Sequence, residues 1–527
     1  MTKAERQWCF AYSAALVLLT AVPYLLGFFA QGEAWRFSGF VFGVEDGNSY
    51  IAKMLSGAEG AWLFRTPYTT MPQRGVLAFI PYILLGKLAQ GEALHEQLVG
   101  LFHLFRSVAI FFEVWAVYRF GALFLREGRW RRWATVLATV GGGLGWALVA
   151  IGQESWLGSL PLDLHSPESF GFLAIYGLPH LVLARALLLT GLVYYLESPA
   201  DPRKGWMAGF VWLGLGLVQP LTVATGYGVV AVHVVIVVLR SSRSGKTAAI
   251  KPWLGSAART VTISAPMVIY NAVAFATDPY LRAWTVQNRI LSPAPPHYLI
   301  AYGIVLVPAV LGGLKVLRSG EPRDWLPVGW VLALPALAYA PVNLQRRLPD
   351  GVWLALAVLA AIGCREWARG AKGRRFLAPT LLLASLPSTL ILLAGGVRAS
   401  LQPGEPVFIP RGAEAAFEWL RGHGQEGDSV VAAFETGNVL PAWAPMRVVI
   451  GHGPETPRLN ELMLEVEQFF QLAAGDAYRQ GFIAENGIDF LFLGPYETAL
   501  GDWRPSSGSF FERVYQEDGY SIYEVGE

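Results

Sequence analysis

The sequence predicts a polytopic α-helical membrane protein with a small α/β domain at its C-terminal end. Three observations support this fold class. Only 15% of the 527 residues are charged, whereas soluble globular proteins usually carry about 25%. Several apolar runs reach the length of about 20 residues that a helix needs to cross a hydrocarbon core of about 30 Å. After residue 400 the long apolar runs stop and the composition becomes acidic.

The two parts of the chain carry opposite net charge. Residues 401–527 hold 20 Asp and Glu against 7 Lys and Arg, whereas residues 1–400 hold 34 basic and 19 acidic residues. We therefore expect a membrane domain over 1–400 and a soluble domain over 401–527. The two cysteines, Cys9 and Cys364, belong to no CxxC or Cys/His cluster. We expect neither a disulfide framework nor a structural zinc site.

The basic loops set the predicted topology, because Lys and Arg in short loops mark the cytoplasmic side of a membrane. These loops are 3–6, 126–133, 201–206, 240–246, 315–324 and 365–375. Placing all of them inside yields eleven spans in the cell membrane, with the N-terminus in the cytoplasm and the C-terminal domain outside. The spans are expected near 10–30, 98–123, 133–152, 177–196, 206–219, 221–239, 256–275, 298–315, 326–341, 352–365 and 377–397.

One apolar segment, residues 74–91, does not fit this count. A span there would invert the next loop and place 126–132 outside. The segment is short and has Pro81 in its middle, so we expect a juxtamembrane or re-entrant helix. The first outer loop then runs over 31–97. Irregular backbone at membrane depth is tolerated where protein or a water-filled cavity satisfies it, which suggests a cavity at the outer face.

An acidic pair stands directly after the first apolar run. Glu45 and Asp46 lie in the stretch VEDGNSY, shortly before Tyr50. A carboxylate at the mouth of an outer cavity can serve as a general base. The alternative is structural, because acidic residues often cap a helix N-terminus, and here the helix would begin near Asn48.

Other predicted outer loops carry cations where the positive-inside rule disfavours them. Arg346 and Arg347 lie in NLQRRLPDG, and Arg282 and Arg289 lie in TDPYLRAWTVQNRI. An anionic ligand would explain them, and Arg suits phosphate because its guanidinium forms two parallel hydrogen bonds. Lipid headgroups or the acidic tail are the alternative partners.

Polar residues in or beside the spans are further candidates, because ionisable groups inside a membrane are usually functional. His180 and Arg185 lie in the outer half of the fourth predicted span and could line the cavity. Asp163, His165 and Glu168 have metal-ligating side chains, but their spacing matches no strong metal motif. We assign no metal site, and a divalent metal stays open as a cofactor.

Helix and strand patterns alternate after residue 400, which predicts an α/β domain of about 120 residues. Its last segment predicts a hairpin with a turn near Asp518 and Gly519. In the loop GHGPETP, His452 and Glu455 could form a site. The more common role of such a loop is to shape the domain or to dock it on the membrane part.

The order of these features resembles the C-type superfamily of polyprenyl-phosphate-dependent glycosyltransferases, and within it the branch of protein mannosyltransferases and lipid A aminoarabinose transferases. Glu45 and Asp46 match the acidic pair of that family. Residues 49–62 resemble its first juxtamembrane helix, and 95–125 resemble its second span. Residues 344–360 resemble its late RYxLPxxP segment.

Two departures from the family pattern concern the donor site. Residues 74–91 stand where the family has its KPPL helix, but Pro72, Gln73 and Arg74 replace the KPP triplet. In the late segment, Arg347 replaces the tyrosine. The donor could therefore differ from the donors of the resembled branch.

The resemblance implies an inverting glycosyltransferase that moves a sugar from a polyprenyl phosphate to an extracytoplasmic glycan, lipid or protein. It implies Asp46 as general base, with Glu45 as the second choice. The expected substrate-binding residues are Arg346, Arg347, Arg289, Arg282, Tyr50 and His180. Membrane lipids are expected partners and nucleic acid is not.

Two other classes of function stay open. One is a lipid or glycan transporter or flippase, for which inverted repeats are expected; the sequence shows no such internal symmetry. The other is a non-catalytic membrane scaffold whose acidic tail binds a partner. A deep outer cavity containing Asp46 would favour the enzyme over the scaffold.

Overall fold

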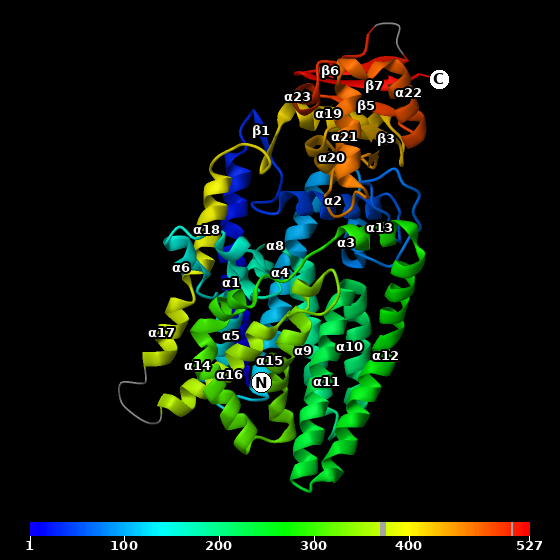
Figure 1. Cartoon of the computed structure of the whole chain (residues 1–527). Helices are drawn as coiled ribbons and strands as arrows, with labels where there is room; N and C mark the ends of the chain where they lie inside the picture. The colour runs from blue at the N-terminus through cyan, green and yellow to red at the C-terminus, as the bar shows by residue number, and fades with distance from the viewer. Residues whose placement is uncertain (369–375, 507–509, 527) are drawn as a thin grey trace. The chain divides into compact units, whose positions relative to one another are not determined.

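A computed structural model describes residues 1–368, 376–506 and 510–526 (Figure 1). The chain divides into two compact units. The first contains Met1–Ala21, Leu104–Ala272 and Arg289–Gly395, and the second contains Val22–His103, Val273–Asn288 and Gly396–Glu527. Residues 369–375 of the predicted basic loop 365–375 lie outside the described residues. The domain boundary that we predicted between residues 400 and 401 stays a prediction.

Within the part of the chain that the structure describes, eight helical segments are long and apolar enough to cross a membrane, so the predicted polytopic helical architecture is confirmed. They are Lys3–Ala30 (α1), Leu94–Ala122 (α4), Pro179–Glu197 (α9), Pro220–Arg243 (α11), Thr247–Thr277 (with α12, Ile250–Thr277), Pro295–Arg318 (in α14, Pro295–Ser319), Gln345–Trp367 (with α16, Val352–Ala368) and Leu377–Ser400 (α17, Leu377–Ala384, and α18, Pro387–Ser400).

The other three predicted spans fall on shorter helices, and the number eleven stays a prediction. The three are Gly128–Val140 (α5) with Gly145–Ala150 (α6), Pro202–Val218 (α10) and Leu326–Ala338 (α15). The break between α5 and α6 has a local cause. Gly142 donates its N–H to the carbonyl of Ser385 (2.7 Å), and a Cβ on Gly143 would lie 2.1 Å from the carbonyl oxygen of Ala301. Glycines at this point let the backbone leave the helix and pack closely.

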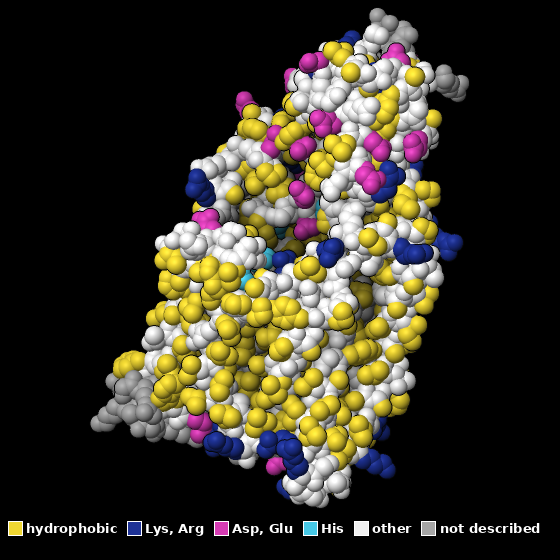
Figure 2. All heavy atoms as spheres, in the orientation of Figure 1, with side chains coloured by type: hydrophobic (Ala, Val, Ile, Leu, Met, Phe, Trp, Pro, Cys, Tyr) yellow, Lys and Arg dark blue, Asp and Glu magenta, His cyan; other side chains and the backbone are white. Residues whose placement is uncertain are grey.

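The remaining helices of the first unit are short: Leu162–His165 (α7) and Gly171–Gly177 (α8). Its apolar helices pack side by side, with α14 against α16, α9 against α10 and α11 against α15 (Figure 1). Hydrophobic side chains cover the visible face of these helices, and Lys and Arg side chains gather near the end where α11 is followed by α12 (Figure 2). This distribution is the one that a lipid-facing surface requires.

The second unit contains the predicted α/β fold. Its five-stranded sheet has the order β4-β3-β5-β7-β6, in which β3 pairs in parallel with β4 and β5, and β7 pairs antiparallel with β5 and β6. The strands are Ser429–Val431 (β3), Arg447–Val448 (β4), Phe490–Leu493 (β5), Phe511–Glu517 (β6) and Tyr520–Val525 (β7). The hairpin turn lies at Asp518 and Gly519, both with positive φ, as predicted.

Helices surround this sheet, and a second, two-stranded sheet joins the outer loop to the tail. The helices are Arg411–His423 (α19), Phe434–Val439 (α20), Leu459–Phe470 (α21), Gly475–Asn486 (α22) and Pro495–Leu500 (α23). In the small sheet, Trp35–Phe37 (β1) pairs antiparallel with Phe408–Pro410 (β2). The unit also contains Val44–Ala58 (α2), Ile80–Gly86 (α3) and Pro279–Gln287 (α13).

The segment 74–91 forms no helix long enough to cross a membrane, and its juxtamembrane or re-entrant position stays a prediction. Its only helix in the described chain is α3, whose seven residues rise about 10 Å, a third of a hydrocarbon core. Helix α3 packs on α2 with almost no space between their backbones. A Cβ on Gly57 would lie 2.0 Å from the Ile83 carbonyl oxygen, and one on Gly86 would lie 1.7 Å from that of Met54.

The contact between α14 and α16 provides a test of this helix packing. Gly312 approaches α16 so closely that a Cβ would lie 2.0 Å from the Leu359 carbonyl oxygen, whereas a Cβ on the adjacent Gly313 would lie 3.7 Å from its nearest neighbour. We expect Gly312→Ala to lower the stability by about 1–3 kcal/mol through overpacking. Gly313→Ala is the matched control, because both changes alter the helix propensity equally. Thermal unfolding in detergent measures the difference, and equal melting temperatures would contradict this packing.

Candidate functional site

The acidic pair lies in the first turn of α2. The helix begins at Val44, after Gly43 in the left-handed conformation, and no side chain caps it. The alternative in which Asp46 caps a helix that begins near Asn48 is therefore wrong. Carboxylates in a first turn interact favourably with the helix dipole, and Glu45 and Asp46 both project from this turn.

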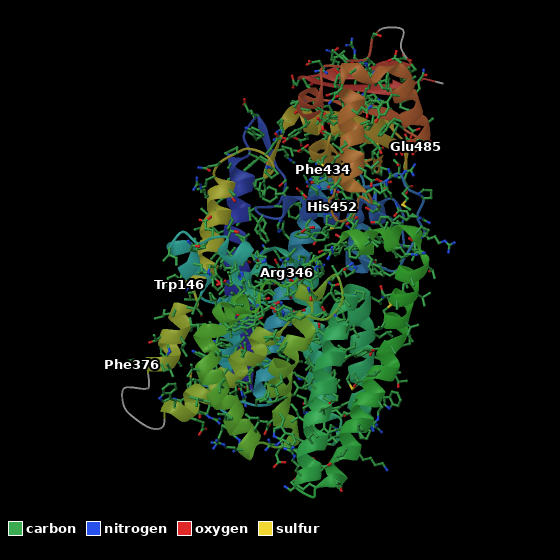
Figure 3. The ribbon with its side chains drawn as sticks, viewed as in Figure 1. Trp146, Arg346, Phe376, Phe434, His452 and Glu485 are labelled. Atoms are coloured by element: carbon green, nitrogen blue, oxygen red, sulfur yellow. The ribbon has the colours of Figure 1, made fainter. Side chains whose placement is uncertain are left out.

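A histidine from the tail reaches Asp46. His452 Nε2 lies 3.2 Å from Asp46 Oδ1. The His452 side chain is 4% exposed and that of Asp46 is 52% exposed. His452 belongs to the loop between β4 and α21 (Figure 3). The GHGPETP loop thus lies beside Asp46. This position is compatible with the predicted role in which His452 and Glu455 form a site.

Glu455 of the same loop is the centre of a buried cluster on α2 and the chain that follows it. Its Oε1 accepts hydrogen bonds from Lys53 Nζ (2.5 Å) and Ser49 Oγ (2.9 Å), and its Oε2 accepts one from Thr66 Oγ1 (2.5 Å). His452 Nδ1 lies 3.3 Å from Oε1, outside hydrogen-bonding direction. The Lys53 ammonium also lies 4.4 Å from the centre of the Phe79 ring.

The groups of this cluster shift one another's pKa values. Burial opposes the charge of Glu455, but Lys53 and His452 hold the pKa of this carboxyl well below its usual range. Burial also opposes the charge of His452, but Asp46 and Glu455 raise the pKa of the imidazole above its usual value. Burial lowers the pKa of Lys53. Asp46, His452, Glu455 and Lys53 therefore form a row of alternating negative and positive charge.

The other candidates of the second unit have different surroundings. Tyr50 is buried and stacks on Tyr82 with ring centres 4.7 Å apart, so it packs α2 against α3. Glu45 is exposed, and its backbone carbonyl accepts a hydrogen bond from Asn438. Arg282 is exposed on α13.

In the first unit, Arg346 and Arg347 lie in a 3₁₀ turn, Gln345–Arg347 (Figure 3). Arg347 Nε lies 3.5 Å from Glu168 Oε1. Arg346 Nη1 lies 3.0 Å from Nε2 of His165, whose Nδ1 lies 2.9 Å from the carbonyl oxygen of Pro161. Burial lowers the pKa of His165, so the neutral ring donates from Nδ1 and accepts at Nε2. The Arg346 Nε is buried without a partner among the described residues.

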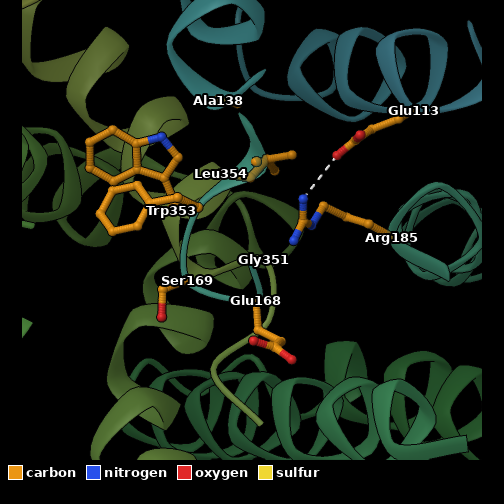
Figure 4. Close-up of a pocket in the computed structure, with 10 residues that line it drawn as sticks. Glu113, Ala138, Glu168, Ser169, Arg185, Gly351, Trp353 and Leu354 are labelled. Atoms are coloured by element: carbon orange, nitrogen blue, oxygen red, sulfur yellow. Dashed lines mark hydrogen bonds and ion pairs between the residues drawn. The ribbon is translucent and has the colours of Figure 1, made fainter. Parts of the chain in front are cut away.

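A second charged cluster of the first unit surrounds Arg185 of α9. The guanidinium lies 3.1 Å from Glu113 Oε1 on α4 and 2.9 Å from Asp350 Oδ1. Its Nη2 also donates to the carbonyl of Pro167 (2.8 Å). Glu113 and Arg185 point toward each other beside a small pocket, which Glu168 also lines (Figure 4).

No protein-family model and no curated protein sequence matches this chain. Solved structures do match it. The arabinofuranosyltransferase AftD from Mycobacteria has a TM-score of 0.58 at 15% identity, over 98% of this chain and 40% of its own. The Archaeoglobus fulgidus oligosaccharyltransferase, tethered with an acceptor peptide containing the NVT sequon, has a TM-score of 0.50 at 13% identity, over 92% of this chain and 69% of its own.

This chain has the C-type glycosyltransferase fold. The resemblance that the sequence suggested is thereby confirmed at the level of the fold. ArnT from Cupriavidus metallidurans covers 97% of this chain at 12% identity, but its TM-score of 0.48 supports no further argument. Membership of the aminoarabinose transferase branch stays a prediction. The match with AftD covers only 40% of the AftD chain.

On the C-type fold, several charged residues join clusters that the sequence did not predict. Glu113 and Asp350 pair with Arg185, and Lys53 pairs with Glu455. The sequence did carry one sign that Glu113 is functional, because Glu113 is an ionisable residue inside a predicted span.

Two predicted residues lie outside these clusters. His180 is half-buried in the first turn of α9, and Arg289 is exposed. Among the described residues, no group of three or more His, Cys, Asp or Glu has the geometry of a metal site.

The buried pair of Lys53 and Glu455 predicts a large effect on stability. Glu455→Gln leaves the Lys53 ammonium buried without its counter-charge, which typically costs about 3–5 kcal/mol. Lys53→Met should have a similar effect, and the double variant should lose less than the sum. Because the pKa of Glu455 is depressed, its contribution is complete above about pH 4.3 and is lost as the pH falls.

Limited proteolysis of the second unit in increasing urea measures this loss. The matched control is Glu461→Gln, which breaks the exposed ion pair with Arg458 (2.7 Å) on the same tail. Exposed pairs contribute at most about 1 kcal/mol. If both glutamine variants resist proteolysis equally, the buried pair does not stabilise the unit.

Proposed function

We propose that this protein is an integral membrane glycosyltransferase that moves a sugar from a polyprenyl phosphate to a hydroxyl on an extracytoplasmic glycan, lipid or protein. The C-type fold supports this class of function. The observation that carries the proposal is Asp46, a half-exposed carboxylate in the first turn of α2 with a buried histidine against it.

In the proposed reaction, the acceptor oxygen attacks the anomeric carbon of the sugar on the face opposite the phosphate. The new carbon–oxygen bond forms as the bond to the phosphate oxygen breaks, so the configuration inverts. The acceptor proton passes to Asp46 as general base, with Glu45 as the second choice. The polyprenyl phosphate leaves with the bonding electron pair, and cations stabilise its charge.

Arg346 is the leading candidate for the lipid phosphate. Its guanidinium contacts a neutral imidazole, and its Nε has no partner among the described residues, whereas Arg347 is already paired with Glu168. A phosphate oxygen would satisfy the Arg346 Nε. Arg347, Arg289, Arg282, His180 and Tyr50 remain proposed substrate-binding residues. We place the N-terminus in the cytoplasm and the tail outside the cell membrane.

Removing the base should slow turnover strongly but leave donor binding intact. Asp46→Asn keeps the shape of the side chain, so we expect a folded protein with unchanged donor affinity and a rate lower by about 10²–10⁴. The assay follows consumption of a panel of polyprenyl-phosphate sugars by the purified protein in detergent. Glu45→Gln, a change in the same turn, tests the second choice and should retain turnover if Asp46 is the base. Full turnover by both variants would refute the catalytic role of this pair, and the transporter and scaffold alternatives predict no donor consumption at all.

Removing the proposed phosphate ligand should weaken donor binding. A charge-assisted hydrogen bond contributes roughly 1.5–3 kcal/mol, so Arg346→Ala should raise the Kd for the donor about 10- to 150-fold. Arg318→Ala, which removes an exposed charge at the end of α14, is the control for net charge. Donor binding is measured with a fluorescent polyprenyl phosphate in detergent. Equal Kd values for the two variants would exclude Arg346 from the phosphate site.

A further inference from the structure

We propose that His452 is a positioning residue for the transfer reaction: from the tail, it holds the Asp46 carboxylate in the orientation that accepts the proton. This inference rests on the proposed function and adds a residue to it. It also gives the C-terminal segment a part in catalysis, because the residue that orients the base comes from the GHGPETP loop and not from α2.

The contact between His452 and Asp46 joins a fixed group to a mobile one. Asp46 is half-exposed on the first turn of a helix, where a carboxylate can adopt several rotamers. His452 is buried, and its Nε2 faces Asp46 Oδ1 at 3.2 Å. A hydrogen bond from a fixed donor selects one orientation of the carboxylate.

The histidine ring is fixed from several sides. The Tyr68 ring centre lies 5.3 Å from that of His452, and Glu455 Oε1 lies 3.3 Å from Nδ1 as a neighbouring charge and not as a hydrogen-bond acceptor. The backbone carbonyl of His452 accepts the N–H groups of Glu455 (3.0 Å) and Thr456 (2.9 Å), which closes a turn. Thr456 Oγ1 in turn donates to the carbonyl of Tyr68 (2.9 Å).

The loop that carries His452 is also held by residues near the end of α13. Gln287 Nε2 donates to the carbonyls of Gly453 and Thr456, both at 2.7 Å. Asn288 Nδ2 donates to the carbonyl of Pro454 at 2.8 Å. Three hydrogen bonds thus hold three backbone carbonyls of one short loop. The position of the imidazole therefore depends on the backbone of this loop as well as on its own side-chain contacts.

The charges that face His452 favour the imidazolium. Asp46 and Glu455 are carboxylates, and against them stand the ammonium of Lys53 and the neutral phenol of Tyr68. Together the carboxylates raise the pKa of His452 in spite of its burial. An imidazolium donates from Nε2 to Asp46 and holds the orientation of the carboxylate until the acceptor proton arrives. The proton then stays on Asp46, and His452 neither gains nor loses one during the transfer.

This arrangement predicts an alkaline limb in the pH profile of turnover. As the pH rises through the elevated pKa of His452, the imidazolium loses its charge and its hold on Asp46 weakens. The charged form contributes its full stabilisation below the ordinary histidine pKa of about 6.5, and this is lost above the folded-state pKa. A histidine that only docks the tail predicts no effect on the pH profile beyond unfolding.

The test compares His452→Ala, His452→Gln and a matched control, His423→Gln, which changes an exposed histidine of the same tail. We expect His452→Ala to lower kcat about 10- to 100-fold with unchanged donor affinity. His452→Gln should recover part of the rate, because its amide Nε2 can donate to Asp46, and should lose the alkaline limb that the wild type shows as the pH rises above the ordinary histidine range. His423→Gln should behave as the wild type.

Two results would overturn the inference while leaving the proposed function intact. One is wild-type turnover and an unchanged pH profile in both His452 variants, with Asp46→Asn inactive. The other is a loss of turnover that parallels the loss of melting temperature, with the alkaline limb retained in His452→Gln. Full activity of Asp46→Asn and Glu45→Gln would instead refute the proposed function.

A measurement without turnover tests the contact itself. The chain has 8 histidines, and in ¹³C-histidine-labelled protein the signal of His452 is the one that is absent from His452→Gln. Its titration should show a pKa above the usual histidine value, and Asp46→Asn should lower this pKa. An unshifted pKa in Asp46→Asn would exclude the contact, whatever the activity of the preparation.

Discussion

Burial of charge is the constraint on which the second unit depends. An ion moved into a protein interior costs several kcal/mol unless a partner and hydrogen bonds compensate it. Lys53 and Glu455 are both fully buried, so α2 and the GHGPETP loop must meet for either to be tolerated. The position of His452 follows from this requirement, because Glu455 lies only three residues further along the same turn. His452 lies beside Asp46 because the buried pair of Lys53 and Glu455 fixes the position of the loop.

The first unit satisfies the same constraint differently. Arg185 is shared by Glu113 and Asp350, so one cation compensates two carboxylates, and the Oε2 of Glu113 has no partner in the described chain. Such a cluster inside a helical bundle is costly and is usually functional. Arg346 and Arg347 are less deeply buried, and their contacts with His165 and Glu168 leave hydrogen-bonding capacity that an anion can use.

Local patterns in the sequence predicted much of the fold and little of the site. An apolar run, a basic loop and the Asp518-Gly519 turn each involve residues that are close in the sequence. Eight of the predicted spans, the short α3 and the hairpin could therefore be predicted. The contact of Asp46 with His452 joins residues 406 positions apart, and no periodicity encodes such a pairing. The break at residues 141–144 was missed for a related reason, since glycines do not interrupt an apolar run although they interrupt the helix.

The position of the tail in the second unit bears on the choice between an enzyme and a scaffold. A tail that serves only as an acidic surface for a partner could be attached through an ordinary apolar contact. Here it is attached through a pair of buried charges, a strand pairing between β1 and β2, and a histidine directed at a half-exposed carboxylate. Replacing a buried ion pair by apolar groups is often neutral or stabilising, so stability alone does not explain why this interface is ionic. Under the proposed function, the orientation of Asp46 supplies such a reason, because the ionic row places the His452 imidazole against this half-exposed carboxylate.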